Sequence, residues 1–402
     1  YLLCKRKWLN ELKKRGNKRV TIVEEVTSIT EEQEQQVEET EIFEQQHQLF
    51  ELKFKELGQK CQELLKTTFK IKSMEKVAEA LGVTYGYARK KKSQCMGQLT
   101  KLVKASNEFQ QLKSVKDAIR WAASRFSEAG LDFGHGMSTA LDEAVYLVLR
   151  GLHLPVDTPA IYWDGLLTDN EKKQLYISLE QRVTQRLPAA YITQEGWFAG
   201  LSFFVDERVL VPRSPIAELV ENQFEPWIDP DQVSSVLDLC TGSGCIGIAC
   251  AYAFPGAQVD LVDISSDALE VAQVNIDRHD ASSLVKTVKS NGFRELKGER
   301  YDIIVSNPPY VDAEDMDALS AEFKHEPEIG LSSGNDGLDL TRHILQHAAK
   351  HLNDGGILIT EVGNSQYALE AAFPNIPFQW LEFERGGDGI FLLTKAQLQE
   401  HF

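Results

Sequence analysis

The sequence predicts an α/β protein: a doubly wound sheet in the C-terminal half, preceded by a helical subdomain and a β-hairpin, with an all-α segment at the N-terminal end. Three observations predict this fold. From about Ile216 a strand–turn–helix pattern repeats to the end of the chain. The stretch from Tyr191 to Val211 alternates aromatic and β-branched residues between glycine turns. Before that stretch, apolar residues recur at helical spacing.

Composition and charge indicate two units. The 402 residues are enough for two or three domains, and 43% apolar with 26% charged residues is ordinary for a globular protein. Residues 1–105 hold 21 Lys and Arg against 15 Glu and no Asp, a net charge of +6. Residues 106–402 hold 22 Lys and Arg against 45 acidic residues, a net charge of −23. Such a change of sign predicts two units with different partners.

Membrane and metal chemistry are not expected. No apolar run approaches the roughly 18 residues of a membrane span, and charge follows too soon after Tyr1 for a signal peptide. We therefore expect a cytoplasmic protein, and the absence of an initial Met indicates a fragment or a processed or trimmed chain. The cysteines show neither CxxC pairs nor zinc-ligand spacing, so we expect reduced thiols in the core and no metal site. They are Cys4, Cys61, Cys95, Cys240, Cys245 and Cys250.

Helices are predicted for the first half of the chain. Residues 28–50 are rich in Glu and Gln and predict a linker that runs into a helix. Residues 51–104 predict three helices, the third capped by Thr84 and ending near Leu102. A helical subdomain is expected over residues 107–190. Its predicted helices are 109–129, 140–150 and 170–186.

The hairpin is expected within residues 191–215, and the doubly wound domain over 216–402. The last two predicted strands are joined by residues 385–388, a connection too short for a parallel crossover, so they should pair antiparallel. The predicted strands are 235–240, 258–263, 285–289, 301–306, 356–361, 378–384 and 389–394.

A glycine-rich turn follows the first of these strands. Gly242, Gly244 and Gly247 have the spacing GxGxxG between a buried strand and an apolar helix. Asp263 closes the next strand 21 residues beyond Gly242, near the offset of about 20 expected for a ribose-binding acid. The negative charge of the Asp238 carboxylate would repel a pyrophosphate, whereas it would attract the ammonium and sulfonium groups of S-adenosylmethionine. We therefore predict that cofactor; the alternative is that Asp238 only caps the turn.

A second motif, Asn307-Pro308-Pro309-Tyr310, stands at the carboxyl end of the fourth strand, where open α/β sheets bind ligands. The Asn307 side-chain oxygen and the Pro308 carbonyl can each accept one N–H of a planar NH2 group. Pro308 and Pro309 hold that carbonyl rigidly because their φ is fixed, and Tyr310 can cover the planar group. The motif predicts methyl transfer to an amide or amino nitrogen; the alternative is a turn without function.

Residues from about 107 to 402 resemble the bacterial HemK-type glutamine N(5)-methyltransferases. The similar stretches are LVPR at 210–213, DLCTGSGCIGIA at 238–249, LVDIS at 261–265, NPPYVDAEDM at 307–316, HEPEIGL at 325–331 and EVGNSQ at 361–366. FGHG at 133–136 and PRSPI at 212–216 are similar to the branch that acts on ribosomal protein three of the large subunit, a basic protein.

The resemblance implies a Rossmann-like class I methyltransferase fold and roles for particular residues. Cys240, Thr241, Gly242, Ser243 and Gly244 would wrap the methionine part of the cofactor. Asp263 would bind the ribose, Asn291 the adenine amino group, and Phe293 would flank the ring. Asn291 stands where the family usually has Asp. Residues 307–310 would hold the glutamine amide, and Asn307 would also belong to the cofactor-binding residues. Residues 107–190 would recognise the substrate.

Residues 1–104 resemble a different family, the Bacteroidota-type sigma factors. Residues 4–15 are similar to the end of the second conserved region, whose front is missing, so residues 1–27 would be a helical remnant of that region. Residues 58–95 are similar to the fourth region, a helix-turn-helix. This implies contact with DNA or RNA polymerase, and a recognition helix at 84–94; a solvated basic helix hairpin is the alternative. The residues suited to phosphates are Arg89, Lys90, Lys91 and Lys92. Our hypothesis for the join is a cloning, assembly or frame fusion near 103–107.

Three classes of function therefore compete. The first is a protein-glutamine methyltransferase, acting on the ribosomal protein or on peptide chain release factors. The second is a DNA adenine amino-methyltransferase, which the −23 charge of residues 106–402 opposes because DNA phosphates are negative. The third is a DNA-binding transcription factor with an inert α/β domain, which the two intact loops oppose. We expect the ribosomal protein to be the substrate.

Overall fold

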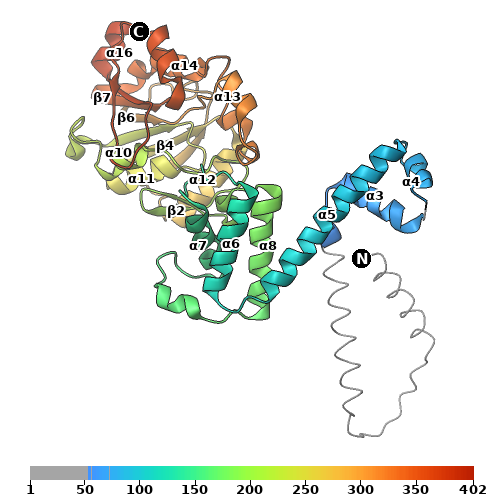
Figure 1. Ribbon diagram of the computed structural model, residues 1–402. Helices are drawn as coiled ribbons and strands as arrows, with labels where there is room; N and C mark the ends of the chain where they lie inside the picture. The colour runs from blue at the N-terminus through green and yellow to red at the C-terminus, as the bar shows by residue number, and fades with distance from the viewer. Residues whose placement is uncertain (1–52, 56, 72) are drawn as a thin grey trace, which may run out of the picture. The chain divides into compact units, whose positions relative to one another are not determined.

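The computed structural model describes residues 53–55, 57–71 and 73–402 (Figure 1). The helix expected in residues 1–27 and the linker expected at 28–50 lie outside the described residues. The chain divides into two compact units, residues 1–107 and 108–402. Among the described helices, none combines the length and apolar character required to span a bilayer.

Three helices make up the described part of the first unit: α3 (Gln59–Lys70), α4 (Met74–Ala80) and α5 (Tyr85–Gln110). Thr84 accepts a hydrogen bond from the Tyr87 N–H at 3.3 Å, as a cap should. The helix continues past the predicted end because residues 103–110 contain neither Gly nor Pro.

One expectation about the cysteines is wrong. Cys61 and Cys95 form a disulfide rather than two free thiols. Both are buried in the small core that α3 and α5 share, and their Cα atoms lie 5.4 Å apart, within the distance that a disulfide requires. Cys240, Cys245 and Cys250 are free thiols, as expected.

The second unit begins with the helical subdomain: α6 (Val115–Ala129), α7 (Ala140–Gly151), α8 (Asp169–Gln185) and α9 (Ala189–Thr193), with a 3-10 turn η1 (Ala160–Asp164). The helix predicted at 109–129 is split because Ser114 and Asp117 form a capping box that starts α6 anew. Phe109 packs against Trp121 and Tyr176, with ring centroids 4.9 and 5.5 Å away.

The hairpin is shorter than predicted. Its strands are β1 (Gly196–Phe198) and β2 (Leu201–Phe203), paired antiparallel. Tyr191 lies in α9 instead, since Pro188 starts a helical turn ahead of it. Residues 204–215 connect the hairpin to α10 (Ile216–Glu221) and contain a turn at 207–209.

Seven strands form the doubly wound sheet, in the order β5-β4-β3-β6-β7-β9-β8. β9 pairs antiparallel with both β7 and β8, which confirms the predicted antiparallel end of the sheet. The strands are β3 (Ser235–Leu239), β4 (Gln258–Asp263), β5 (Val285–Lys289), β6 (Tyr301–Ser306), β7 (Leu352–Glu361), β8 (Gln379–Trp380) and β9 (Ile390–Thr394).

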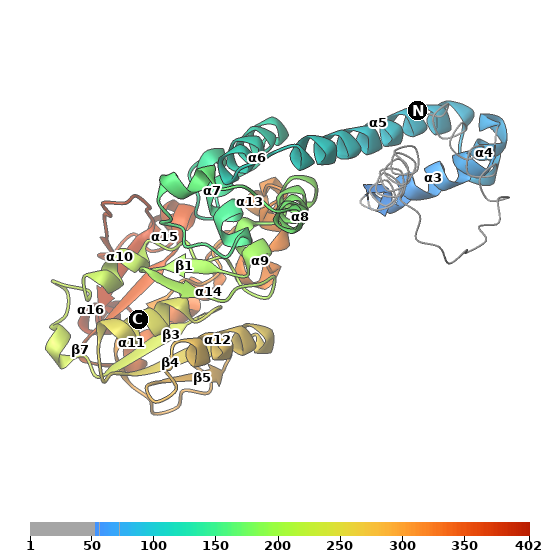
Figure 2. The same cartoon turned by 90° about the horizontal axis from the view of Figure 1, so that it is seen from below.

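Helices cover both faces of the sheet. One core joins it to α10, α11 (Cys245–Ala253) and α12 (Ser266–Arg278). Figure 2 shows α11 beside β3 and α12 beside β4 and β5. The other core joins it to α14 (Asp339–His351), α15 (Gln366–Ala372) and α16 (Lys395–His401). The remaining elements are α13 (Ala313–Ala318) and the 3-10 turns η2 (Pro230–Gln232), η3 (Phe323–His325), η4 (Glu328–Gly330) and η5 (Gly363–Ser365).

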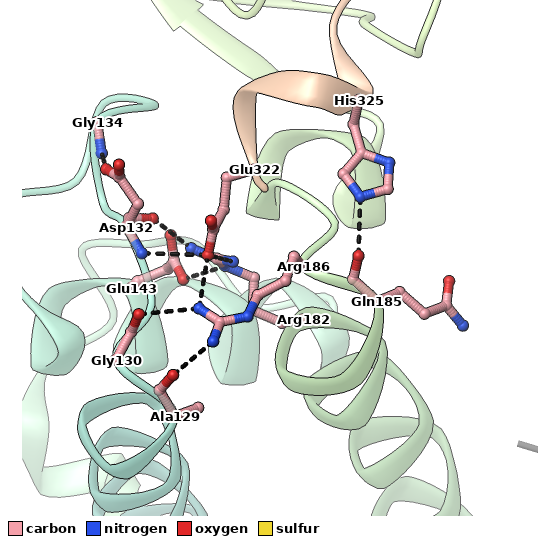
Figure 3. Close-up of polar contacts among 10 residues, drawn as sticks. All are labelled: Ala129, Gly130, Asp132, Gly134, Glu143, Arg182, Gln185, Arg186, Glu322 and His325. Carbon is pink, nitrogen blue, oxygen red and sulfur yellow. Dashed lines mark hydrogen bonds and ion pairs between the residues drawn. The ribbon is translucent and has the colours of Figure 1, made fainter. Parts of the chain in front are cut away.

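A buried ion-pair network fixes the segment after α13 to the helical subdomain (Figure 3). Glu322 Oε1 accepts hydrogen bonds from Arg182 Nη1 at 3.2 Å, from Arg186 Nη1 at 3.1 Å and from the Asp132 N–H at 3.1 Å. Arg182, with 1% of its surface exposed, also donates to Glu143 Oε1 at 2.6 Å. The subdomain thereby holds the chain that leaves the Asn-Pro-Pro-Tyr motif.

Replacing Arg182 with Ala should lower the stability of the second unit by about 3–5 kcal/mol, because Glu143 and Glu322 would stay buried without their shared cation. Urea unfolding followed by circular dichroism measures this loss. Arg342→Ala is the matched control: its pair with Asp336 is only partly buried, with 34% and 44% of the side chains exposed, and should contribute less than about 1 kcal/mol. Equal losses in the two variants would contradict the role given to the network.

Candidate functional site

The site forms where β3 and β6 end side by side. The two strands pair in parallel with Leu239 opposite Ser306. The Ser306 hydroxyl donates to the Leu239 carbonyl at 2.6 Å, which fixes this register at the carboxyl edge. The glycine loop after β3 and the Asn-Pro-Pro-Tyr loop after β6 therefore start from adjacent points.

One cavity of about 790 Å³ takes in both loops. Nine of the thirteen residues predicted for the cofactor and substrate line it: Cys240, Thr241, Gly242, Ser243, Asp263, Asn291, Asn307, Pro309 and Tyr310. Four others lie outside its lining: Asp238, Gly244, Phe293 and Pro308.

The glycine loop is shaped for close approach of a ligand. Gly242 has φ +54°, and a Cβ placed there would have no neighbour within 4 Å, so its backbone faces open space. Gly247 serves packing instead, because a Cβ there would come within 2.2 Å of a Leu261 methyl group. Cys240 has φ +65°, a left-handed conformation that non-glycine residues seldom adopt and that is concentrated at functional sites.

Asp263 connects the glycine loop to the end of β4. Its Oδ2 accepts from the Gly242 N–H at 3.0 Å and its Oδ1 from the Ser265 N–H at 2.9 Å. Burial raises the pKa of this carboxyl group, while the backbone hydrogen bonds act against the shift. Each oxygen accepts one hydrogen bond and retains a further lone pair, as the binding of ribose hydroxyls requires.

Asp238 lies beneath the loop. It is fully buried, and its Oδ2 accepts from the Thr241 hydroxyl at 2.5 Å and from the Gly247 N–H at 2.9 Å. Its Oδ1 has no hydrogen-bond partner in the described part of the chain. Burial raises the pKa of Asp238 to about 7. The two hydrogen bonds of Asp238 therefore stabilise the turn. Because the residue does not line the cavity, its carboxylate can affect a ligand only electrostatically, across the glycine loop.

The expectation for Phe293 needs a correction. Its side chain is 4% exposed and stacks on His351, with ring centroids 4.8 Å apart, so it belongs to the core rather than to the cavity wall. The backbone turns at Gly292, where a Cβ would lie 2.7 Å from His343 Nε2. His343 lines this end of the cavity together with Asn291.

Three residues of the Asn-Pro-Pro-Tyr motif, Asn307, Pro309 and Tyr310, line the same cavity. Among the described residues, no hydrogen bond takes up the Asn307 side chain, so its oxygen is free to accept from a ligand. Pro308 is buried, which keeps the turn rigid. The Tyr310 hydroxyl donates to Glu361 Oε1 at 2.9 Å.

Sequence reasoning assigned no role to several residues that line this cavity. They are Arg213, Ser214, Phe323, His343 and Glu361. Arg213 and Glu361 belong to two of the similar stretches, LVPR and EVGNSQ, but neither motif alone indicates what its charged side chain does. Arg213 makes a two-pronged ion pair with Glu326, at 2.6 and 2.8 Å. Burial alone would raise the pKa of Glu326, yet His135 and Arg213 lower it to about 2.

The residues expected to contact DNA lie in the first unit, near the start of α5. Arg89 and Lys90 are exposed, whereas Lys91 and Lys92 are half-buried. The Lys92 Nζ lies 3.7 Å from the Met74 sulfur, which directs its stem across the small core. Within the described ranges, no cluster of three metal-ligating side chains occurs.

The sequence is similar to that of known proteins. The methyltransferase small domain family matches residues 224–335. The ribosomal protein uL3 glutamine methyltransferase of Neisseria gonorrhoeae is 51% identical over 291 residues, which cover 72% of this chain and 97% of that protein. The protein of the same name from Francisella tularensis is 49% identical and covers 72% of this chain and 93% of its own length. This identity over almost the full length of its relatives places the chain in the family of ribosomal protein uL3 glutamine methyltransferases.

Proposed function

We propose that this protein transfers a methyl group from S-adenosylmethionine to the side-chain amide nitrogen of a glutamine in the large-subunit ribosomal protein uL3. The observation that carries the proposal is that Asn307 and Tyr310 line the same cavity as the glycine loop and Asp263. Relatives about 50% identical are named for this activity, which supports the substrate.

The cavity residues fit this cofactor. The open backbone at Gly242 leaves room for the methionine part, and Asp263 would accept from the ribose hydroxyls. Asn291 and His343 would border the adenine. When bound, S-adenosylmethionine supplies a methyl group made electrophilic by its sulfonium sulfur.

The chain's own contribution is to position the amide. The Asn307 oxygen and the Pro308 carbonyl would each accept one N–H of the glutamine, which raises the electron density on nitrogen and aims its lone pair. Tyr310 would cover the planar group and favour the positive charge that develops on it. Positioning and charge compensation are what a direct methyl transfer requires.

Charge favours a basic protein partner, and a depression on the helical subdomain offers a surface for it. The −23 charge of residues 106–402 attracts a basic ribosomal protein and speeds its encounter. A wide-open surface depression lies on the helical subdomain, where residues such as Phe133 and Arg186 line it. The segment 319–323 contributes to this depression and to the cofactor cavity. We assign substrate recognition to this side of the unit, so that the chain flanking the glutamine reaches the Tyr310 wall.

Methyl transfer from labelled cofactor tests the proposal directly. Ribosomal protein uL3, peptide chain release factors and an adenine-containing DNA duplex are assayed side by side. We expect label in uL3, on glutamine. Label found only in the release factors would make them the substrate instead of uL3. Label found only in DNA would contradict protein methylation.

Asn307→Ala should lower kcat by about 100- to 1,000-fold, since one of the two acceptors for the amide is lost. Cofactor affinity measured by calorimetry should change little, because Asn307 serves the substrate. Asn353→Ala is the matched control: this amide bonds Asp302 at the opposite end of the sheet. A loss of cofactor binding that matches the loss of rate would show that the role given to Asn307 is wrong.

Asp238→Asn should weaken cofactor binding only above about pH 7. Below its raised pKa of about 7 the Asp238 carboxyl is neutral, like Asn, so the two dissociation constants should agree near pH 6. By pH 8 the wild-type carboxylate stabilises a cationic ligand, and the variant should bind up to roughly tenfold more weakly.

Calorimetry between pH 6 and 8 measures the ratio of the two dissociation constants. Asp302→Asn is the control: burial would raise the pKa of Asp302, but hydrogen bonds from Ser234 and Asn353 lower it below its ordinary value. It therefore stays ionised over this range. If the ratio for Asp238→Asn does not vary with pH, the ionised Asp238 carboxylate does not stabilise the bound cofactor.

For the first unit we propose DNA binding by the helix-turn-helix of α4 and α5. The support is the exposure of Tyr85, Tyr87 and Arg89 on the first turns of α5, after the turn at Gly82. Deleting residues 1–104 should abolish DNA retention in a gel-shift assay and leave methyl transfer unchanged. A large loss of methyl transfer would instead make the first unit part of the enzyme.

A further inference from the structure

Tyr310 is held at three separate points. Its hydroxyl donates to Glu361 Oε1 at 2.9 Å. Its main-chain carbonyl accepts from the Ser365 hydroxyl at 2.8 Å. Its ring lies against Gly363, where a Cβ would come within 2.7 Å of the ring carbon Cε2. All three partners belong to the segment at the end of β7, residues 361–365.

Glu361 is the centre of this arrangement. The residue is 6% exposed, and its second oxygen accepts a short hydrogen bond from the Ser214 hydroxyl. Ser214 in turn accepts from the Ile216 N–H at 3.2 Å. One buried carboxylate thus joins the end of β7, the Asn-Pro-Pro-Tyr motif and the loop before α10.

The backbone around Glu361 is itself fixed. Glu361 pairs with Ile390 in the antiparallel ladder of β7 and β9. The N–H groups of Val362 and Gly363 both donate to the Gly389 carbonyl, at 2.7 and 3.2 Å. The antiparallel end of the sheet therefore sets the position of the carboxylate, and the carboxylate sets the position of the Tyr310 hydroxyl.

We propose that Glu361 is a positioning residue for methyl transfer: through the Tyr310 hydroxyl it holds the aromatic ring at the angle that covers the substrate amide. The proposal rests on the function proposed above and adds to it a residue that need not touch the substrate. An aromatic ring free to rotate about its side-chain bonds would leave the amide less well confined, and small errors in position cost rate.

A double-mutant cycle tests the proposal. Tyr310→Phe keeps the ring and removes the hydroxyl, and Glu361→Ala removes the acceptor. Each should lower kcat by roughly 10- to 100-fold, with cofactor affinity little changed, because a hydrogen bond to a carboxylate is lost. The double variant should be no slower than the slower single variant, since both changes break one interaction. Glu361→Gln, which retains an acceptor oxygen, should recover most of the rate.

Tyr301→Phe is the matched control. Its hydroxyl donates to Asp260 Oδ2 at 2.8 Å on the same sheet, outside the cavity lining. It should change thermal stability and leave kcat near the wild-type value. Rate losses that multiply in the Tyr310 and Glu361 double variant, or a Tyr310→Phe rate equal to wild type, would overturn the proposal.

The outcomes separate this proposal from the proposed function. If the wild-type protein methylates uL3 and the cycle is additive, Glu361 has no positioning role and the function stands. The same cycle is also measured by thermal unfolding, which requires no substrate. Additive shifts in Tm would show that Tyr310 and Glu361 are not energetically coupled. This result would contradict the proposal even if the protein transfers no methyl group to uL3.

Discussion

The register between β3 and β6 is the constraint on which the rest of the site depends. Leu239 pairs with Ser306, and the Ser306 hydroxyl donates a hydrogen bond to the Leu239 carbonyl at 2.6 Å. Shifting β6 by one residue would turn every side chain of the strand to the other face. The glycine loop and Asn307 would then leave their common cavity. The apolar side chains on both faces of these strands make such a shift costly, so the core itself fixes the site.

Two kinds of buried carboxyl group surround this cavity. Those that hold the frame together are paired: Glu322 and Glu326 face Arg side chains, and the pKa of each is lowered despite burial. Asp238 and Asp263 have no cation beside them in the described part of the chain, and burial raises the pKa of each. Buried carboxyl groups without a neighbouring cation increase the affinity of a site for a cationic cofactor, because the cofactor supplies the positive charge that they lack.

Much of the fold could be predicted from the sequence. The strands from 235 to 306 lie where alternating turns and apolar runs predicted them, and the short connection at 385–388 predicted the antiparallel pair correctly. These features are local in sequence. The Cys61–Cys95 disulfide and the Tyr310–Glu361 contact join residues 34 and 51 positions apart, and no local pattern reports such distances. Phe293 was misplaced for a related reason: the turn at Gly292 decides whether its side chain enters the core or the cavity.

A crystal structure with S-adenosylhomocysteine and a glutamine-containing uL3 peptide tests the central claim most directly. The measured quantities are the distances from the glutamine amide nitrogen to the Asn307 side-chain oxygen and to the Pro308 carbonyl oxygen. We expect both to be about 2.7–3.2 Å, with the amide between the cofactor sulfur and Tyr310. An amide bound elsewhere, or one that reaches neither oxygen, would contradict the assignment of this motif as the methyl-acceptor site.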